Sequence, residues 1–334
     1  MKAMLLRERG PIETSPLVWT DLPDPVPGPG EIRVKVTACG ICRTDLHVIE
    51  GDLPPRRTPV IPGHQVVGTV DATGEEASGF PRGTRVGIAW LAQTCGECDF
   101  CAGGRENLCD RSLFTGYHRD GGFAEYAVVP EAFAYPLPPA FRDAEAAPLL
   151  CAGIIGFRAL RRADLPSGGT LALYGFGSSA HIVIQLALHR GCGVFVVTRG
   201  EKHRDLAKRM GASWAGENPE GMPEAPDSAI LFAPVGELVP RALKHLKKGG
   251  TLSLAGIHMS DVPRMKYGEC LFYEKNIRSV TANTRQDGED LLREASEIPL
   301  RPKVTLFALE EANRALKLLK AGKLEGTGVL TVGG

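Results

Sequence analysis

The pattern of apolar and polar positions changes character near residue 150. Before that point, short runs alternate polar and apolar residues, as in residues 31–37, and this is the period of a half-buried strand. Gly- and Pro-rich turns separate the runs. The pattern therefore predicts a β-rich first part, with further strands at residues 66–70, 84–88 and 123–129.

After residue 150, apolar strand-like runs alternate with helical patterns. Strands are expected at residues 171–174, 194–197, 230–232 and 251–255, with helices at 178–189, 201–210 and 237–247. A β-α-β alternation predicts a parallel sheet that is covered on both faces. Beyond residue 285 a helix through residues 290–294 precedes an amphipathic helix, whose apolar stripe is Leu309, Ala312, Leu316 and Leu319.

Composition excludes several classes of protein. The 334 residues include 39 Lys+Arg and 39 Asp+Glu, so the net charge is zero and does not favour nucleic acid as a partner. No run approaches the ~20 apolar residues of a membrane span. Charges interrupt residues 1–9, where a signal peptide needs an apolar run. With nine cysteines, an odd number, these features predict a cytoplasmic protein in a reducing environment.

Four cysteines lie close together in the chain at C-x2-C-x2-C-x7-C spacing: Cys95, Cys98, Cys101 and Cys109. Four thiolates complete the closed tetrahedral shell of a structural zinc, and the short steps let the chain fold over one ion. Three cysteines within seven residues cannot readily form disulfides with one another. A zinc ribbon that binds nucleic acid is disfavoured, because the segment lacks a basic aromatic stripe.

A glycine-containing turn follows the expected strand at residues 171–174. Gly175, Gly177 and Ala180 form G-x-G-x-x-A before a helix. In a dinucleotide site the first glycine makes the tight turn, the second lets backbone approach the pyrophosphate, and the third small residue allows close helix packing. Small residues at a strand–helix turn are also common without a ligand. The β-α-β context favours dinucleotide binding.

The residues that follow the expected strand at 194–197 help to discriminate between NAD(H) and NADP(H). An NAD site usually has a carboxylate there for the ribose 2′-hydroxyl, whereas this chain has Thr198 and Arg199, with Arg204 nearby. A guanidinium suits a 2′-phosphate. The alternatives are a solvated Arg199 and a ribose contact from Glu201. The sequence therefore favours NADP(H), with NAD(H) as the alternative.

A second group of potential metal ligands lies outside the four-cysteine segment. One histidine and two cysteines would make the Cys2His set of an open catalytic zinc site. Spacing alone does not select the trio from the available candidates, which are Cys39, Cys42, His47, His64 and Cys151.

Taken together, these motifs resemble the zinc-dependent medium-chain dehydrogenase/reductase family, the alcohol dehydrogenases, over essentially the whole chain. The matching segments are residues 40–47, 63–64, 95–109, 151 and 175–177. The resemblance implies an α/β fold with a GroES-like catalytic domain at 1–150 and 285–334, including a structural-zinc lobe at 91–112. It also implies a Rossmann cofactor domain at 151–284, and a homodimer or homotetramer.

Carried over by position, the resemblance implies a catalytic zinc on Cys42, His64 and Cys151, hence two zinc ions per chain. Thr44 would hydrogen-bond the substrate alcohol oxygen, and His47 would pass its proton outward. Asp45 would orient His64. Three further thiols would only pack in the interior: Cys39, Cys192 and Cys270.

The implied reaction is hydride transfer between a primary or secondary alcohol and a nicotinamide cofactor, or the reverse reduction of an aldehyde. Trp90 matches a position where a large aromatic narrows the pocket for small alcohols, although simple core packing is an equal alternative. Gln65 departs from the family, which usually has Glu after the zinc-binding histidine. Residues 326–330 lack the basic residue that many members direct at the cofactor phosphates.

Two alternatives remain at this stage. The first is a non-catalytic zinc- and dinucleotide-binding family member, which Gln65 alone favours. The second is a reductase for another carbonyl class, such as a polyol, cinnamyl aldehyde or quinone. Zinc content together with NADPH oxidation on a panel of aldehydes would discriminate among them.

Overall fold

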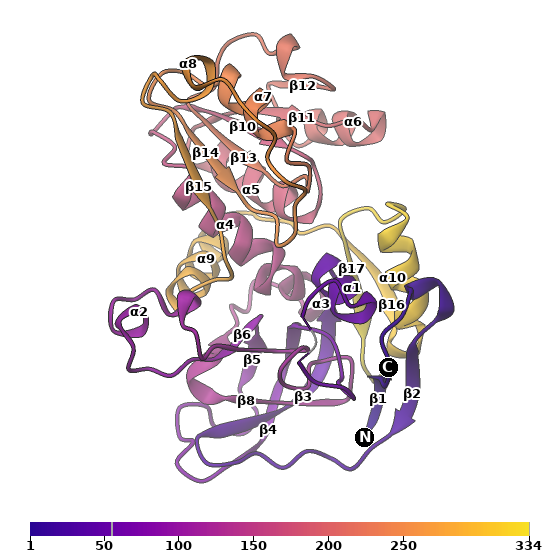
Figure 1. Ribbon diagram of the computed structural model, residues 1–334. Coiled ribbons are helices and arrows are strands. Elements are labelled where there is room, and N and C mark those ends of the chain that lie inside the picture. The colour runs from indigo at the N-terminus through magenta and orange to yellow at the C-terminus, as the bar shows by residue number, and fades with distance from the viewer. Residues whose placement is uncertain (55, 334) are drawn as a thin grey trace. The chain divides into compact units, whose positions relative to one another are not determined.

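The computed structural model describes residues 1–54 and 56–333, and the chain divides into two compact units (Figure 1). The first unit contains residues 1–152, 282–296 and the chain from residue 301 onward. The second contains residues 153–281 and 297–300. The divisions therefore lie two or three residues from the expected positions at 150 and 285. Residues 297–300 belong to the second unit, whereas the sequence analysis placed them in the first.

The first unit is built on a seven-stranded sheet. Its strands are β3 (Glu31–Gly40), β4 (Gln65–Thr73), β5 (Arg85–Ile88), β8 (Tyr126–Pro130), β9 (Ala134–Pro136), β16 (Val304–Ala308) and β17 (Thr327–Thr331). Their order is β16-β17-β3-β4-β5-β9, and β8 also pairs with β3. Only the β16–β17 pair is parallel in this sheet. The predicted β-rich first part is confirmed.

Smaller elements complete the first unit. Two pairs of short strands are β1 (Lys2–Leu6) with β2 (Leu17–Asp21) and β6 (Leu91–Gln93) with β7 (Leu113–Phe114). The helices are α1 (Arg43–Glu50), α2 (Asp99–Ala102), α3 (Asp143–Ala146), α9 (Arg285–Glu297) and α10 (Ala312–Lys320). Single 3₁₀ turns are η1 (Ile12–Thr14), η2 (Glu106–Leu108), η3 (Glu131–Phe133), η4 (Ala147–Leu150) and η6 (Leu309–Glu311).

This sheet buries the apolar residues that recur at every second position of its strands. In β3, Ile32, Val34 and Val36 are buried and alternate with more exposed neighbours, as the period of two requires. The amphipathic stripe near the C-terminus also points inward, but α10 begins only at Ala312. The preceding residues form the 3₁₀ turn η6, so the helix is shorter than the stripe suggested.

The second unit is a parallel sheet with helices. Its strands are β10 (Thr170–Tyr174), β11 (Gly193–Val197), β12 (Trp214–Gly216), β13 (Ser228–Leu231), β14 (Thr251–Leu254) and β15 (Asn276–Ser279). Its helical elements are α4 (Ala152–Arg162), α5 (Ser178–His189), α6 (Glu201–Arg209), η5 (Pro219–Gly221), α7 (Leu238–His245) and α8 (Tyr267–Cys270). The predicted strands and helices of this region are present, with ends shifted by up to two residues.

The strand order in the second unit is β12-β11-β10-β13-β14-β15, and every pair is parallel. The order reverses between β10 and β13, which lie side by side in the centre. In doubly wound sheets, ligands bind at the carboxyl ends of the strands at this point of reversal. The turn that follows β10 therefore occupies the position where such a fold takes its cofactor.

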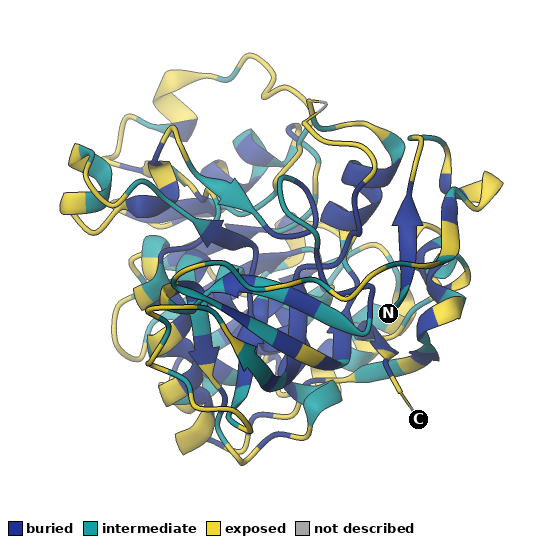
Figure 2. Ribbon diagram, turned by 90° about the horizontal axis from the view of Figure 1, so that it is seen from below, coloured by how far each residue is buried: buried dark blue, intermediate teal, exposed yellow. Residues whose placement is uncertain are grey.

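Burial follows the sheets in both units. In Figure 2 the central strands are largely dark blue, while connecting loops and helix ends are yellow. One apolar cluster fills the first unit around residues such as Phe123 and Ile32, and another fills the second around Tyr174 and Leu252. Among the described residues, no helix combines the length and apolarity needed to cross a membrane.

Candidate active site and metal centres

The start of α1 arranges three of the candidate residues. Cys42 is the N-cap residue, and its backbone N–H donates to Asp45 Oδ2 at 2.8 Å. The backbone N–H of Thr44 donates to Cys42 Sγ at 3.4 Å. A carboxylate in the first helical turn satisfies an N–H that the helix itself leaves unpaired. The Cys42 sulfur and the Asp45 carboxylate are thereby fixed by one helix terminus.

Cys42, His64 and Cys151 come together from three separate elements. His64 directly precedes β4, and Cys151 directly follows η4 as its C-cap residue. His64 Nε2 lies 3.3 Å from each of the two sulfurs, and the sulfurs lie 3.9 Å apart. Ligands of a tetrahedral zinc, at ~2.3 Å for sulfur and ~2.0 Å for nitrogen, are about 3.5–3.8 Å apart. The donor set and its spacing fit a zinc ion.

Asp45 determines how His64 presents its ring. Its Oδ1 lies 3.0 Å from His64 Nδ1, and both side chains are almost completely buried. We assign the proton to Nδ1, which donates to the carboxylate, so that Nε2 directs its lone pair at the two thiols. Asp45 therefore acts on the metal position only through His64 and Cys42.

Charge in this site is tightly balanced. Burial lowers the pKa of His64, but the negative charges of Asp45 and Cys42 outweigh it and raise the pKa to about 10. The hydrogen bond from Cys151 and the charge of His64 hold the pKa of Cys42 well below its usual range, despite burial. The negative charges of Asp45 and Cys42 thus favour a positive charge where the ligands converge. A divalent cation at that position would supply this charge and would bind Nε2 in its deprotonated form.

Gln65 begins β4, directly after His64, and is completely buried. Neither its Oε1 nor its Nε2 has a hydrogen-bond partner among the described residues. Its side chain packs across Gly40, where an added Cβ would lie 2.8 Å from Oε1. A buried amide without partners is unusual and points to a group such as ordered water or a ligand beside it.

His47 lies one turn after Thr44 on α1. Its Nδ1 is 2.7 Å from Asp52 Oδ2, and its side chain is 16% exposed. The backbone N–H of Asp52 also donates to the His47 carbonyl at 3.0 Å. The ring is therefore held on a half-buried position rather than projecting into water. Thr44 is largely buried.

Trp90 lies against the metal ligands. Its ring meets the His64 ring edge to face, with centroids 5.0 Å apart. Phe114 and Tyr117 stack on it at 4.9 Å and 5.9 Å. Phe114 and Tyr117 belong to no sequence motif. The β6–β7 pairing places Phe114 opposite Leu91, next to Trp90, and Tyr117 follows after the turn at Gly116.

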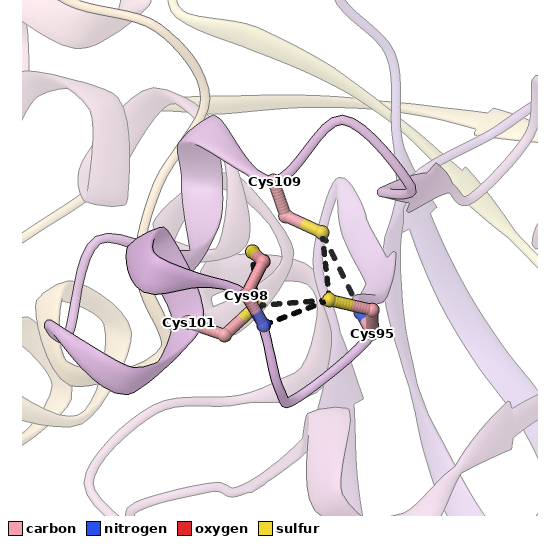
Figure 3. Close-up of side chains that lie close together, drawn as sticks. All are labelled: Cys95, Cys98, Cys101 and Cys109. Carbon is pink, nitrogen blue, oxygen red and sulfur yellow. Dashed lines mark hydrogen bonds between the residues drawn. The ribbon is translucent and has the colours of Figure 1, made fainter.

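The four cysteines of the 91–112 lobe converge in Figure 3, where their side chains point toward one another. The sulfur of Cys95 lies 3.8 Å from that of Cys101 and 3.5 Å from that of Cys109, and those of Cys98 and Cys101 are 3.5 Å apart. Backbone N–H groups of Glu97 and Cys98 point at the Cys95 sulfur and lower its pKa to about 6. Four thiol ligands at these distances fit a closed tetrahedral zinc.

The three remaining cysteines take no part in these groups. Cys39, Cys192 and Cys270 are buried and form no disulfide. All nine cysteines of the chain are free thiols, and seven of them belong to the two clusters.

The glycine turn of the second unit follows β10 at the central position of the sheet. Gly175 has φ of 91°, a conformation that favours glycine, and an added Cβ would lie 3.1 Å from the Ala233 nitrogen. Gly177 is the N-cap of α5, and an added Cβ there would meet nothing within 4 Å. Ala180 is completely buried. The open side of Gly177 is where a pyrophosphate could approach the helix N-terminus.

The turn after β11 carries the residues proposed to choose the cofactor. Arg204 Nη1 donates to the carbonyls of Thr198 at 3.1 Å and Arg199 at 2.6 Å, so its guanidinium holds the turn itself. The Thr198 backbone is tied to Gly216 at 2.9 Å. The Arg199 side chain is exposed.

Known protein families match both units. The model of the alcohol dehydrogenase GroES-like domain matches residues 28–139, and that of the zinc-binding dehydrogenase matches residues 180–297. The chain belongs to the alcohol dehydrogenases of the medium-chain dehydrogenase/reductase family. The resemblance seen in the sequence is thereby confirmed, and so is the α/β fold class with its GroES-like and Rossmann parts.

Individual relatives agree with this assignment. A protein of Mycobacterium tuberculosis, “Probable alcohol dehydrogenase AdhA”, is 50% identical over 99% of this chain and 97% of its own length. An alcohol dehydrogenase of Geobacillus stearothermophilus is 35% identical over 90% of this chain and 91% of its own. A solved NAD-dependent alcohol dehydrogenase superposes with a TM-score of 0.88 at 27% identity and covers both chains completely. The dehydrogenase therefore carries out oxidoreduction of alcohols and aldehydes.

Proposed function

We propose that this dehydrogenase interconverts small alcohols and aldehydes with NADP(H), using a catalytic zinc on Cys42, His64 and Cys151. A second, structural zinc would occupy the four-cysteine lobe. The observation that carries the proposal is the convergence of His64 Nε2 on two sulfurs at 3.3 Å, with Asp45 behind its ring. A ligand set with one open position is typical of catalytic rather than structural zinc.

A zinc ion at this set would supply Lewis-acid polarisation of the substrate oxygen. Thr44 would accept the proton of the substrate hydroxyl, because its side chain follows Cys42 on the same helix turn. His47 would carry that proton outward. The Asp52 contact at His47 Nδ1 supports this role because it would orient the ring, and we infer that Nε2 exchanges the proton.

The wall beside His64 favours small apolar substrates. It consists of the edge of Trp90, with Phe114 and Tyr117 stacked behind it. Aromatic rings offer an apolar surface and little to satisfy the several hydroxyls of a polyol. Reduction of a polyol-derived carbonyl is thus disfavoured, and reduction of a cinnamyl aldehyde or a quinone is the remaining alternative activity. The non-catalytic alternative rests on Gln65 alone.

NADP(H) is the proposed cofactor because the turn after β11 has no carboxylate at residues 198–200 and exposes Arg199. Since Arg204 holds the backbone of this turn, Arg199 is the side chain that would contact the 2′-phosphate. A charge-assisted hydrogen bond contributes about 1.5–3 kcal/mol, so Arg199→Ala should lower the NADPH:NADH preference at least ~10-fold. The matched control is Arg209→Ala, which removes an exposed arginine at the end of the helix that follows this turn, α6.

A homodimer or homotetramer is proposed from the edge of the second sheet. Strand β15 pairs with β14 only, among the described residues, and Ile277 on it is 37% exposed. Tyr267, Phe272 and Tyr273 are exposed in the segment that precedes it. An unpaired edge with apolar neighbours is a natural site for pairing with a second copy. A cytoplasmic location is proposed from the nine free thiols, which a reducing compartment maintains.

The decisive experiment measures metal content and NADPH oxidation on a panel of aldehydes, polyols and quinones. We expect two zinc ions per chain and the highest kcat/KM on small apolar aldehydes. Thr44→Val should lower turnover about 10²–10⁴-fold, the range for an obligatory acid–base group, while Thr44→Ser should retain most of it. His47→Gln should have a smaller effect, largest below neutral pH. Full activity of Thr44→Val would refute the proton path, and a clear NADH preference would refute the cofactor choice.

A further inference from the structure

The four-cysteine lobe is closed at its base by strands whose ends lie beside the candidate catalytic site. Strands β6 and β7 flank the lobe and pair antiparallel, with Leu91 opposite Phe114. Just outside that pair, the Thr115 N–H donates to the Trp90 carbonyl at 2.9 Å, and Thr115 Oγ1 donates to the Ala89 carbonyl at 2.8 Å. The base of the lobe and the backbone of Trp90 are therefore one hydrogen-bonded unit.

Two aromatic side chains also hold the ring of Trp90 in place. Phe114 stacks on it with planes 13° apart, and Tyr117 stacks with planes 14° apart. Trp90 is only 8% exposed. Each stacked pair contributes an attraction beyond simple burial, and a ring covered in this way cannot turn about its side-chain bonds without displacing its neighbours.

Hydrogen bonds fix the two residues that stack on Trp90, Phe114 and Tyr117. The Tyr117 hydroxyl donates to the Pro54 carbonyl. The Phe114 N–H donates to His118 Nδ1 at 3.2 Å, and the Phe114 carbonyl accepts from His118 N–H at 2.9 Å. The chain turns tightly between them at Gly116, where φ is 74°. The orientation of both rings thus depends on the short segment that leaves the lobe.

We propose that the four-cysteine lobe is a specificity element as well as a stabilising one: its closed base sets the tilt of Trp90, with Phe114 and Tyr117 as positioning residues. This inference rests on the proposed function, in which Trp90 limits the substrate space beside His64. The structure supports the link because Trp90 contacts the His64 ring on one side and the lobe base on the other. Loosening the base frees the ring and widens the space for substrate.

The test compares kcat/KM for ethanol and 1-hexanol in variants that leave the candidate catalytic ligands Cys42, His64 and Cys151 intact. Phe114→Leu removes one stacked ring, and Tyr117→Phe removes only the Pro54 anchor. Cys98→Ser opens the lobe. Phe100→Leu is the matched control, since Phe100 lies in the lobe on α2 and its ring faces Arg105. We expect the hexanol:ethanol ratio to rise at least ~10-fold in Phe114→Leu and Cys98→Ser, less in Tyr117→Phe, and not in Phe100→Leu.

A second readout follows Trp90 without any turnover. The chain has three tryptophans, so Trp19→Phe with Trp214→Phe leaves Trp90 as the sole indole. In that background, Phe114→Leu should increase quenching of Trp90 by acrylamide and shift its emission to the red. This measurement does not need Cys98→Ser, so it still tests the proposal if Cys98→Ser does not fold at the assay temperature.

Each result decides the inference. An unchanged substrate ratio and unchanged Trp90 emission in Phe114→Leu would overturn it. An equal change in Phe100→Leu would also overturn it, because the effect would then not depend on the side chains that contact Trp90. Absence of alcohol turnover in the unmodified protein would instead count against the proposed function, and the emission measurements would still report whether the lobe positions Trp90.

Discussion

The four-cysteine lobe and the Cys42–His64–Cys151 set use similar ligands but are assembled differently. The lobe draws all its ligands from one loop, in which Cys95 and Cys109 are 14 residues apart. The second set joins a helix N-cap, a strand start and a 3₁₀ turn, and Cys42 and Cys151 are 109 residues apart. A local loop can organise itself around an ion, whereas the second set exists only once the sheet has formed.

The two regions also differ in what surrounds the ligands. In the lobe, Cys95, Cys98 and Cys101 are partly exposed and Cys109 is buried, and the surrounding backbone supplies N–H groups to the sulfurs. At the second site, His64 and Asp45 are 1% and 2% exposed, and a carboxylate orients the imidazole. We therefore expect a metal in the lobe to contribute to folding, whereas at the second site we expect the fold to position the ligands before a metal binds.

The largest expected effect is the loss of activity when a ligand of the second site, rather than of the lobe, is replaced. Cys42→Ser should lose one zinc per chain and at least ~10³-fold in kcat, because Lewis-acid stabilisation contributes several kcal/mol. The melting temperature should change little, since the sheet already holds the other ligands. Metal analysis, steady-state kinetics and thermal unfolding of the same preparation measure this. Retention of both zinc ions and of activity would remove Cys42 from the catalytic set.

Cys98→Ser is the counterpart in the lobe. It should also lose one zinc, but the main consequence should be a melting temperature about 5–10 °C lower, which corresponds to a few kcal/mol. Residual activity per folded molecule should greatly exceed that of Cys42→Ser. A variant with full zinc content and normal thermal stability would contradict the structural assignment.

A smaller effect is expected from Asp45→Asn, which tests whether the second site is prepared by its surroundings. An amide can still accept from His64 Nδ1, but the negative charge is lost, so zinc affinity at this site should fall about 10–100-fold. Glu97→Gln is the matched control, because it removes a carboxylate next to the lobe ligand Cys98 that pairs with Arg111. Zinc competition with a chelator measures both. Equal affinities in Asp45→Asn and the unmodified chain would argue against preorganisation by Asp45.

The smallest effect concerns Gln65. Replacing a buried, unpartnered amide by an apolar side chain of similar shape is neutral or stabilising, so Gln65→Met should raise the free energy of unfolding by at most ~1 kcal/mol. Thermal unfolding of the zinc-loaded and zinc-depleted protein measures this. If Gln65→Met lowered the melting temperature of the zinc-loaded protein only, the Gln65 amide would interact with the metal site. The second site would then have a fourth potential ligand, as the four-cysteine lobe has.

Local patterns predicted four strands of the second unit, β10, β11, β13 and β14, and the helices α5, α6 and α7, but not β12, β15, α4 or α8. The helix at residues 178–189 was predicted with the observed bounds, because Gly177 precedes a run of apolar residues that continues to the end of the helix. The strand predicted at 31–37 extends to Gly40, since it continues to pair with β4 and β17 beyond its alternating stretch. The short strands β16 and β17 were not predicted, because their sequences carry weak alternation and they depend on pairing.

The sequence by itself determined the four-cysteine group, the glycine turn and the family, because each is encoded in ligand spacing or in a short motif. Ligand spacing alone left the second set open among five residues, and only the family resemblance selected Cys42, His64 and Cys151 from them. Only the tertiary structure brought Cys151 to Cys42 and His64, and only it placed Phe114 and Tyr117 on Trp90. The physical reason is that local spacing fixes contacts within one loop, whereas contacts between distant segments follow from strand pairing and burial.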